Sequence, residues 1–196
     1  DLIREIKRWI DTGVRVSKVQ ALLVNESLDG SNGWRDQQEA LLQLLQNGNI
    51  PRLRQWLKER TRDYPAETLT LHLLIPLRRR LRCQQPTLLA MLSLLDGILI
   101  NHISASLAAS RKKYNKDALV VGWNIHDTTR LWLEGWRVSE QGWRVEVLAN
   151  SLNQLRPDLF EGHTLMVWCG DAPTPAQRQQ LATWQAAGHA IYPLGI

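Results

Sequence analysis

The residues with the clearest chemical potential follow a short apolar run at 118–121 and read Gly-Trp-Asn-Ile-His-Asp-Thr-Thr over 122–129. The apolar run predicts a strand that is buried on both faces. Ligands of open parallel sheets bind just beyond the carboxyl ends of the strands, so His126 lies where a cofactor-binding residue is expected. Asp127 or Thr128 could equally cap a following helix. A capping turn with an incidental histidine is therefore the alternative.

Signatures of known enzyme classes are missing from the rest of the sequence. It contains no GxxxxGK, GxGxxG, GxSxG, HExxH or CxxC pattern. Cys83 and Cys169 cannot form a disulfide framework, and they suit a reducing cytoplasm. His72 and His102 occur in apolar helical surroundings, where a packed histidine is commoner than a ligand. We therefore expect a cytoplasmic protein that is not an enzyme and holds no metal ion.

Two kinds of element must position these residues. From residue 117 onward, short apolar runs alternate with helical spacing, which predicts a parallel sheet with right-handed crossovers. The expected strands are 118–122, 144–148, 164–168 and 190–192, and the expected helices are 127–140 and 174–187.

The preceding residues, 34–114, have the apolar spacing of several antiparallel helices joined by short connections. Pro76 lies inside the helical run that starts at Pro65 and predicts a kink or a break near that point. The longest expected helix runs from Pro86 to about Lys113 and is apolar almost all round, which is typical of the central helix of a bundle. It contains Asp96, and no stretch approaches ~18 apolar residues free of charge, so we expect no membrane span.

Charge divides the chain at the same place. Residues 1–116 carry 19 basic and 11 acidic side chains, whereas residues 117–196 carry 5 basic and 8 acidic ones. A basic half can bind nucleic acid or an acidic partner. Solvated arginine-rich helix faces explain the same counts. The sign change nevertheless favours two modules with a boundary near residue 116.

The sequence resembles the MerR family of transcription regulators. Residues 1–28 resemble the last two helices of a MerR-type DNA-binding domain. The remainder resembles the enterobacterial MerR-like activators of curli and biofilm genes. The motifs that carry this likeness are Asn-Gly-Trp-Arg-Asp-Gln-Gln-Glu at 32–39, Ile-Pro-Leu-Arg-Arg-Arg-Leu at 75–81 and Ala-Leu-Val-Val-Gly-Trp-Asn at 118–124.

The resemblance implies a fold of the α plus α/β class. Its effector part is similar to the cobalamin-binding sensor domains of light-responsive MerR regulators, which pair a four-helix bundle with a flavodoxin-like domain. The expected divisions are therefore an N-terminal helical pair at 1–28, a linker at 29–33, a four-helix-type bundle at 34–116 and a small Rossmann-like parallel sheet of about four strands at 117–196.

The resemblance also implies that the cofactor has been lost. The family's DxHxxG motif, whose histidine ligates cobalt, falls on Asn124, His126 and Thr129. Asn124 lacks the charge that orients a ligating imidazole, and Thr129 adds a branched side chain where the cofactor tail passes a glycine. Trp168 could fill the tail cavity. Residues 84–97 also lack the Trp, Glu and His of the family's cap, so we expect cobalamin binding to be lost.

Partners follow from the same resemblance. Promoter DNA is expected to be read by a recognition helix and wing upstream of Asp1, with Lys7, Arg8 and Lys18 as phosphate contacts. The implied protein partners are RNA polymerase, a diguanylate cyclase and a cyclic-di-GMP phosphodiesterase. The resemblance is also compatible with a homodimer, and we expect no membrane partner. Candidate partner-binding residues are Arg78, Arg79, Arg80 and Arg82. A working small-molecule sensor, for cobalamin or a dinucleotide, is the alternative function.

Overall fold

A computed structural model describes residues 30–195 of the chain. The expected N-terminal helical pair lies outside the described residues, and so do its phosphate-contact candidates Lys7, Arg8 and Lys18. The chain divides into two compact units with the boundary after His102. The first unit is helical and the second contains the sheet, so the predicted α plus α/β fold class is confirmed.

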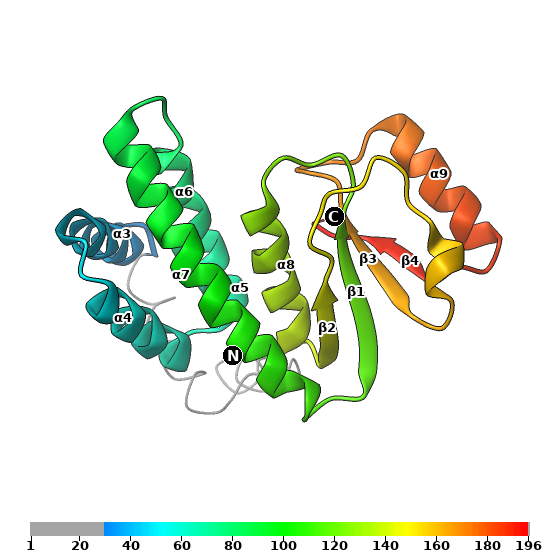
Figure 1. Ribbon diagram of the computed structural model, residues 1–196, viewed down its shortest axis with the longest axis horizontal. Helices are drawn as coiled ribbons and strands as arrows, with labels where there is room; N and C mark the ends of the chain where they lie inside the picture. The colour runs from blue at the N-terminus through cyan, green and yellow to red at the C-terminus, as the bar shows by residue number, and fades with distance from the viewer. Residues whose placement is uncertain (1–29, 196) are drawn as a thin grey trace. The chain divides into compact units, whose positions relative to one another are not determined.

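The helical unit is built from successive helices with short connections (Figure 1). They are α3 (Gly30–Asn47), α4 (Ile50–Asp63), α5 (Ala66–Leu69), the π-helical segment η1 (Thr70–Leu74), α6 (Ile75–Leu81) and α7 (Pro86–Arg111) up to His102. The rest of α7 belongs to the second unit. Helix α3 starts at Gly30, so residues 30–33, expected as linker, form its first turn. Trp34 anchors that turn, because its buried ring packs edge-on against Tyr64 and stacks on His72.

The kink expected at Pro76 takes the form of the π-helical segment η1. Pro76 has no N–H, so it cannot donate to the carbonyl of His72, four residues earlier. The backbone widens instead, and Ile75 N–H donates to the Thr70 carbonyl. The His72 carbonyl accepts a hydrogen bond from Gln38 Nε2 of α3 at 3.2 Å. A side chain from a neighbouring helix thus supplies the donor that the proline removes.

Helix α7 carries one charged residue in its middle. Arg78 Nε of α6 donates to Asp96 Oδ1 at 2.7 Å, and Arg78 Nη2 donates to Asp96 Oδ2 at 3.0 Å. By length and composition α7 could cross a membrane, contrary to expectation, and 28% of its most apolar window is buried. A single such helix is weak evidence, since core helices of soluble proteins share these properties.

The second unit holds four parallel strands in the order β2-β1-β3-β4. They are β1 (Lys116–Gly122), β2 (Trp143–Val147), β3 (Thr164–Trp168) and β4 (Ile191–Pro193). Helix α8 (Thr128–Glu140), the 3-10 helix η2 (Pro157–Phe160) and α9 (Pro175–Ala186) connect them. This order is that of the first four strands of a flavodoxin-like sheet, the kind of sheet that the resemblance implied.

Helices α8 and α9 pack on opposite faces of this sheet. On the α8 side, a Cβ added to Gly135 would lie 2.9 Å from Val147 and 3.4 Å from Val145, so the glycine allows close packing on β1 and β2. On the α9 side, the core cluster joins Leu181 with alternate strand residues. Those strand residues are Leu119, Val121, Leu165, Val167 and Ile191.

Candidate functional site

The loop between β1 and α8 is held by hydrogen bonds to the loop after β2. Asn124 has a φ of 52°, a left-handed conformation that asparagine tolerates better than most residues. Its N–H donates to the Leu152 carbonyl at 2.9 Å, and Ile125 N–H donates to Ser151 Oγ at 2.8 Å. Asp127 Oδ1 accepts from Arg130 N–H at 3.3 Å and caps α8. The loop thus has the geometry of the capping turn.

The three positions of the degenerate cofactor motif differ in exposure. Asn124 and His126 are exposed, whereas Thr129, in the first turn of α8, is 7% exposed. Thr129 thus places its branched side chain inside the protein, while the other two residues are open to solvent.

Trp168 fills the space beyond the carboxyl end of β3 on the α8 side of the sheet. Its side chain is 4% exposed. The Arg130 guanidinium carbon lies 4.4 Å from the ring centroid, within range of a cation–π interaction. Gly195 has a φ of 80°, and a Cβ added there would lie 2.6 Å from Trp168 Cζ3. The indole is therefore enclosed by α8 and by the residues after β4.

Trp123 comes directly after β1, and its side chain lies on the α9 face of the sheet, opposite to that of Trp168. Its Nε1 donates to the Asn153 carbonyl at 3.1 Å. Its ring centroid lies 5.5 Å from that of Trp184 on α9, with the rings tilted by 43°. Trp123 is thus a core residue under α9, whereas Trp168 lies on the α8 side of the sheet.

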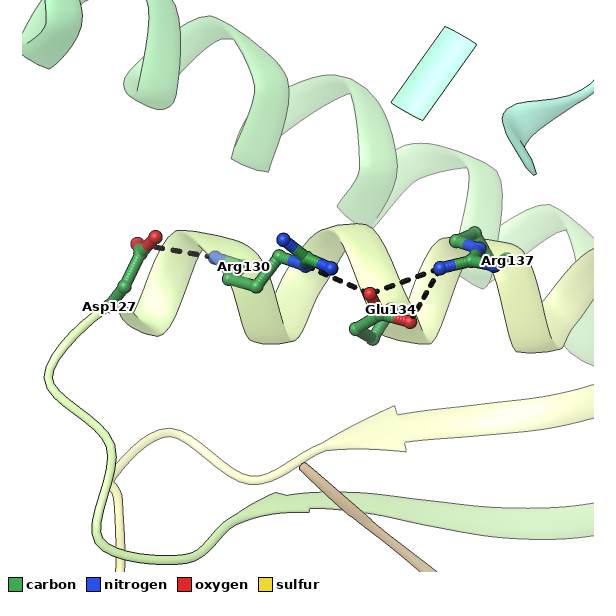
Figure 2. A network of polar contacts seen from close by, with 4 residues as sticks. All are labelled: Asp127, Arg130, Glu134 and Arg137. Carbon is green, nitrogen blue, oxygen red and sulfur yellow. Dashed lines mark hydrogen bonds and ion pairs between the residues drawn. The ribbon is translucent and has the colours of Figure 1, made fainter. Parts of the chain in front are cut away.

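Arg130, which contacts Trp168, belongs to a charged network on α8. This network was not predicted from the sequence. Figure 2 shows Glu134 between Arg130 and Arg137. Glu134 Oε1 accepts from Arg130 Nε at 2.8 Å, and Arg137 Nη1 lies 3.1 Å from Glu134 Oε2. The Glu134 side chain is 3% exposed, so both cations offset the cost of burying its charge. The i, i+4 and i, i+3 spacing was the signal available in the sequence.

The arginines proposed as a partner surface do not act as one group. Arg78 is 4% exposed and ion-paired with Asp96, so it does not belong to the patch: this is a correction. Helical periodicity turns Arg78 inward, toward α7, while its neighbours face outward. Arg79, Arg80 and Arg82 are exposed. Arg80 Nη1 lies 2.8 Å from Glu39 Oε1 of α3, which leaves a smaller exposed surface at the end of α6.

The described residues offer little for metal binding, and the thiol next to the sheet edge is unreactive. Within residues 30–195, no group of three or more His, Cys, Asp or Glu side chains is placed to hold a metal ion. Cys169, the residue after β3, is half-buried, and burial raises the pKa of its thiol to about 11. Such a thiol is protonated near neutral pH and is a poor nucleophile.

Comparison with known proteins gives a consistent family likeness. Residues 34–108 match the family described as "Transcriptional regulator MlrA, helical domain", and residues 115–191 match "Transcriptional regulator MlrA, C-terminal domain". The chain is 70% identical to the HTH-type transcriptional regulator MlrA of Escherichia coli K12 over 196 residues, which is all of this chain and 81% of that protein. The protein of the same name from Salmonella typhimurium SL1344 is 64% identical over the same shares. No solved structure matches.

Proposed function

This chain belongs to the MlrA family of transcriptional regulators, and we propose that it forms the effector part of a MerR-like activator of curli and biofilm genes. One observation carries the proposal: the 70% identity to a named HTH-type regulator extends over the whole chain. As such a regulator, the full protein acts in the cytoplasm, binds promoter DNA and contacts RNA polymerase.

The α/β unit of this regulator works without cobalamin. Three features support that part of the proposal. Trp168 is buried at the sheet edge on the α8 side, Thr129 is buried where the related domains have glycine, and Asn124 and His126 are exposed. A bulky cofactor tail would have to displace a ring that is enclosed between Arg130 and Gly195.

The effector part instead receives its signal from protein partners. The resemblance implies a diguanylate cyclase and a cyclic-di-GMP phosphodiesterase, so contact with these enzymes would relay the second-messenger state to transcription. The exposed arginines at the end of α6, Arg79 and Arg82, remain candidates for this contact. Arg78 is not, because it holds α6 to α7 through Asp96.

A transcription reporter tests the proposal. The matching 196-residue part of the Escherichia coli relative is replaced by this chain, and the hybrid is expressed in a strain that lacks the relative and carries a curli-promoter reporter. We expect the hybrid to restore reporter activity. Leu99→Asp, which places a charge at a fully buried position near the middle of α7, is the negative control. A hybrid that accumulates normally but leaves the reporter silent would refute the proposal.

A further inference from the structure

Helices α4 and α7 of the helical unit line a groove that the proposed function does not use. Its volume is about 210 Å³. It is lined by Arg54, Leu57 and Lys58 of α4 and by Ile98, Asn101 and His102 of α7. The groove therefore combines two cations, an amide, an imidazole and two apolar side chains within one helical unit.

Among the residues that the structure describes, none forms an acidic partner of the two cations of this groove. Arg54 and Lys58 lie one turn apart on α4 and are both exposed. No ion pair is made by either side chain in the part of the chain that the structure describes. The neighbouring carboxylate, Glu59, is engaged elsewhere, because its Oε1 accepts from Gln55 Nε2 at 3.1 Å. The positive charge at the groove is thus left for an external anion.

The apolar residues give the groove a floor. Leu57 is 3% exposed and Ile98 is 6% exposed, so both are fixed in the core of the helical unit. Asn101, next to them on α7, is exposed and offers both a donor and an acceptor. A hollow with cations on one wall, an apolar floor and a polar amide suits a ligand with a charged end and an uncharged end.

We propose that the α4–α7 groove binds a small phosphate ester. The phosphate lies between Arg54 and Lys58, because a planar guanidinium and an ammonium together match its charge and its oxygens. The organic part lies on Leu57 and Ile98, within hydrogen-bonding reach of Asn101. The volume of about 210 Å³ is below the range of drug-sized pockets, so the groove takes the phosphate and the adjoining part of a mononucleotide-sized ester, and the rest of the ligand extends beyond the groove.

The phosphate could also come from a nucleic-acid backbone, so the experiment must separate these two sources. A duplex presents a row of phosphates to a convex basic surface and gains affinity by releasing counterions. It has no need of an apolar floor. Binding that depends on the floor as well as on the cations therefore favours the small ester.

Isothermal titration of the 196-residue chain at low ionic strength tests the proposal. The probes are adenosine 5′-monophosphate, inorganic phosphate, adenosine and a random-sequence DNA duplex. We expect the nucleotide to bind more tightly than phosphate or adenosine alone. The double variant Arg54→Gln/Lys58→Gln should weaken nucleotide binding by at least about tenfold, and Ile98→Ala should weaken it without affecting inorganic phosphate.

Arg52→Gln/Arg62→Gln is the matched control, because it removes the same charge from exposed positions of α4 that do not line the groove. It should leave nucleotide affinity within about twofold. The proposal is overturned if no phosphate probe binds, or if both double variants weaken binding equally. It is also overturned if the duplex binds and the nucleotide does not.

Discussion

The guanidinium carbon of Arg130 lies 4.4 Å from the centre of the Trp168 ring, and Gly195 closes on the same ring. Together they enclose an indole at the carboxyl edge of the sheet, the edge at which open parallel sheets bind ligands. Arg130 is further held by Glu134, which also contacts Arg137 (Figure 2). The edge is therefore filled by a packed, hydrogen-bonded arrangement.

Trp168→Ala should reduce the free energy of unfolding by about 3–5 kcal/mol, because it removes a buried aromatic ring and leaves a cavity. Urea denaturation followed by circular dichroism measures this change. Trp143→Ala is the control, since Trp143 is only half-buried at the start of β2 and should cost less. An equal loss in the two variants would contradict the enclosed position of Trp168.

Gly195→Ala tests the same contact from the other side. The added Cβ would meet the indole at 2.6 Å, and overpacking of this kind costs about 1–3 kcal/mol. The steric part of that cost should disappear in a Trp168→Ala background, while the backbone cost of the positive φ remains. A double-mutant cycle should therefore give a coupling above about 0.5 kcal/mol. Strict additivity would mean that the two residues are not in contact.

Glu134→Gln should destabilise the protein by about 2–4 kcal/mol, because it leaves two partly buried arginines without their shared carboxylate. The control is Asp158→Asn, which removes the carboxylate of the exposed Arg156–Asp158 pair. Its melting temperature should equal that of the wild type within error. If the melting temperatures of both variants equal that of the wild type, the network on α8 contributes no stability.

Asp96→Asn should lower the free energy of unfolding by about 3 kcal/mol, since it breaks a bidentate pair with a buried arginine. The double variant Arg78→Met/Asp96→Leu should regain most of that loss, because it replaces the ion pair with apolar side chains of similar size. Denaturant titration of the three proteins measures both effects. A double variant less stable than Asp96→Asn would show that the pair is required as such.

Cys169 should resist alkylation near neutral pH, because burial raises the pKa of its thiol to about 11. At pH 8, iodoacetamide should modify the exposed Cys83 first, as mass spectrometry of tryptic peptides would show. The raised pKa stabilises the folded state fully below the unfolded value of 9.0, and this contribution is lost as the pH rises from 9.0 to about 11. Cys169→Ser should flatten the stability profile in that window. Faster labelling of Cys169 than of Cys83 would contradict its burial.

Periodicity and turn residues predicted most of the fold. The positions of the strands, the helix from Pro86 and the distortion at Pro76 followed from local patterns that tertiary packing did not override. The flavodoxin-like arrangement of the strands was implied by the family resemblance. The start of α3 was not predicted, because the glycines and asparagine at residues 30–33 are typical of a linker. The contact that anchors this turn, between Trp34 and His72, is a tertiary one.

The candidate site was harder to predict from the sequence than the fold was. His126 was predicted as a candidate ligand because of its residue type, yet it is exposed. The side chain buried at the carboxyl edge of the sheet is that of Trp168. The partners of Trp168, Arg130 and Gly195, come from different elements, so no local spacing brings them together. Likewise, the sequence did not distinguish Arg78 from the three arginines near it. In the structure Arg78 is buried and paired with Asp96.

The central claim is that the effector part acts through proteins and without cobalamin. Interferometry tests it most directly, with the chain immobilised and presented with a purified diguanylate cyclase and a cyclic-di-GMP phosphodiesterase of the curli system, with and without excess hydroxocobalamin. We predict saturable binding of at least one enzyme, with the same affinity in both conditions. Failure of both enzymes to bind, or binding that requires hydroxocobalamin, would contradict the account.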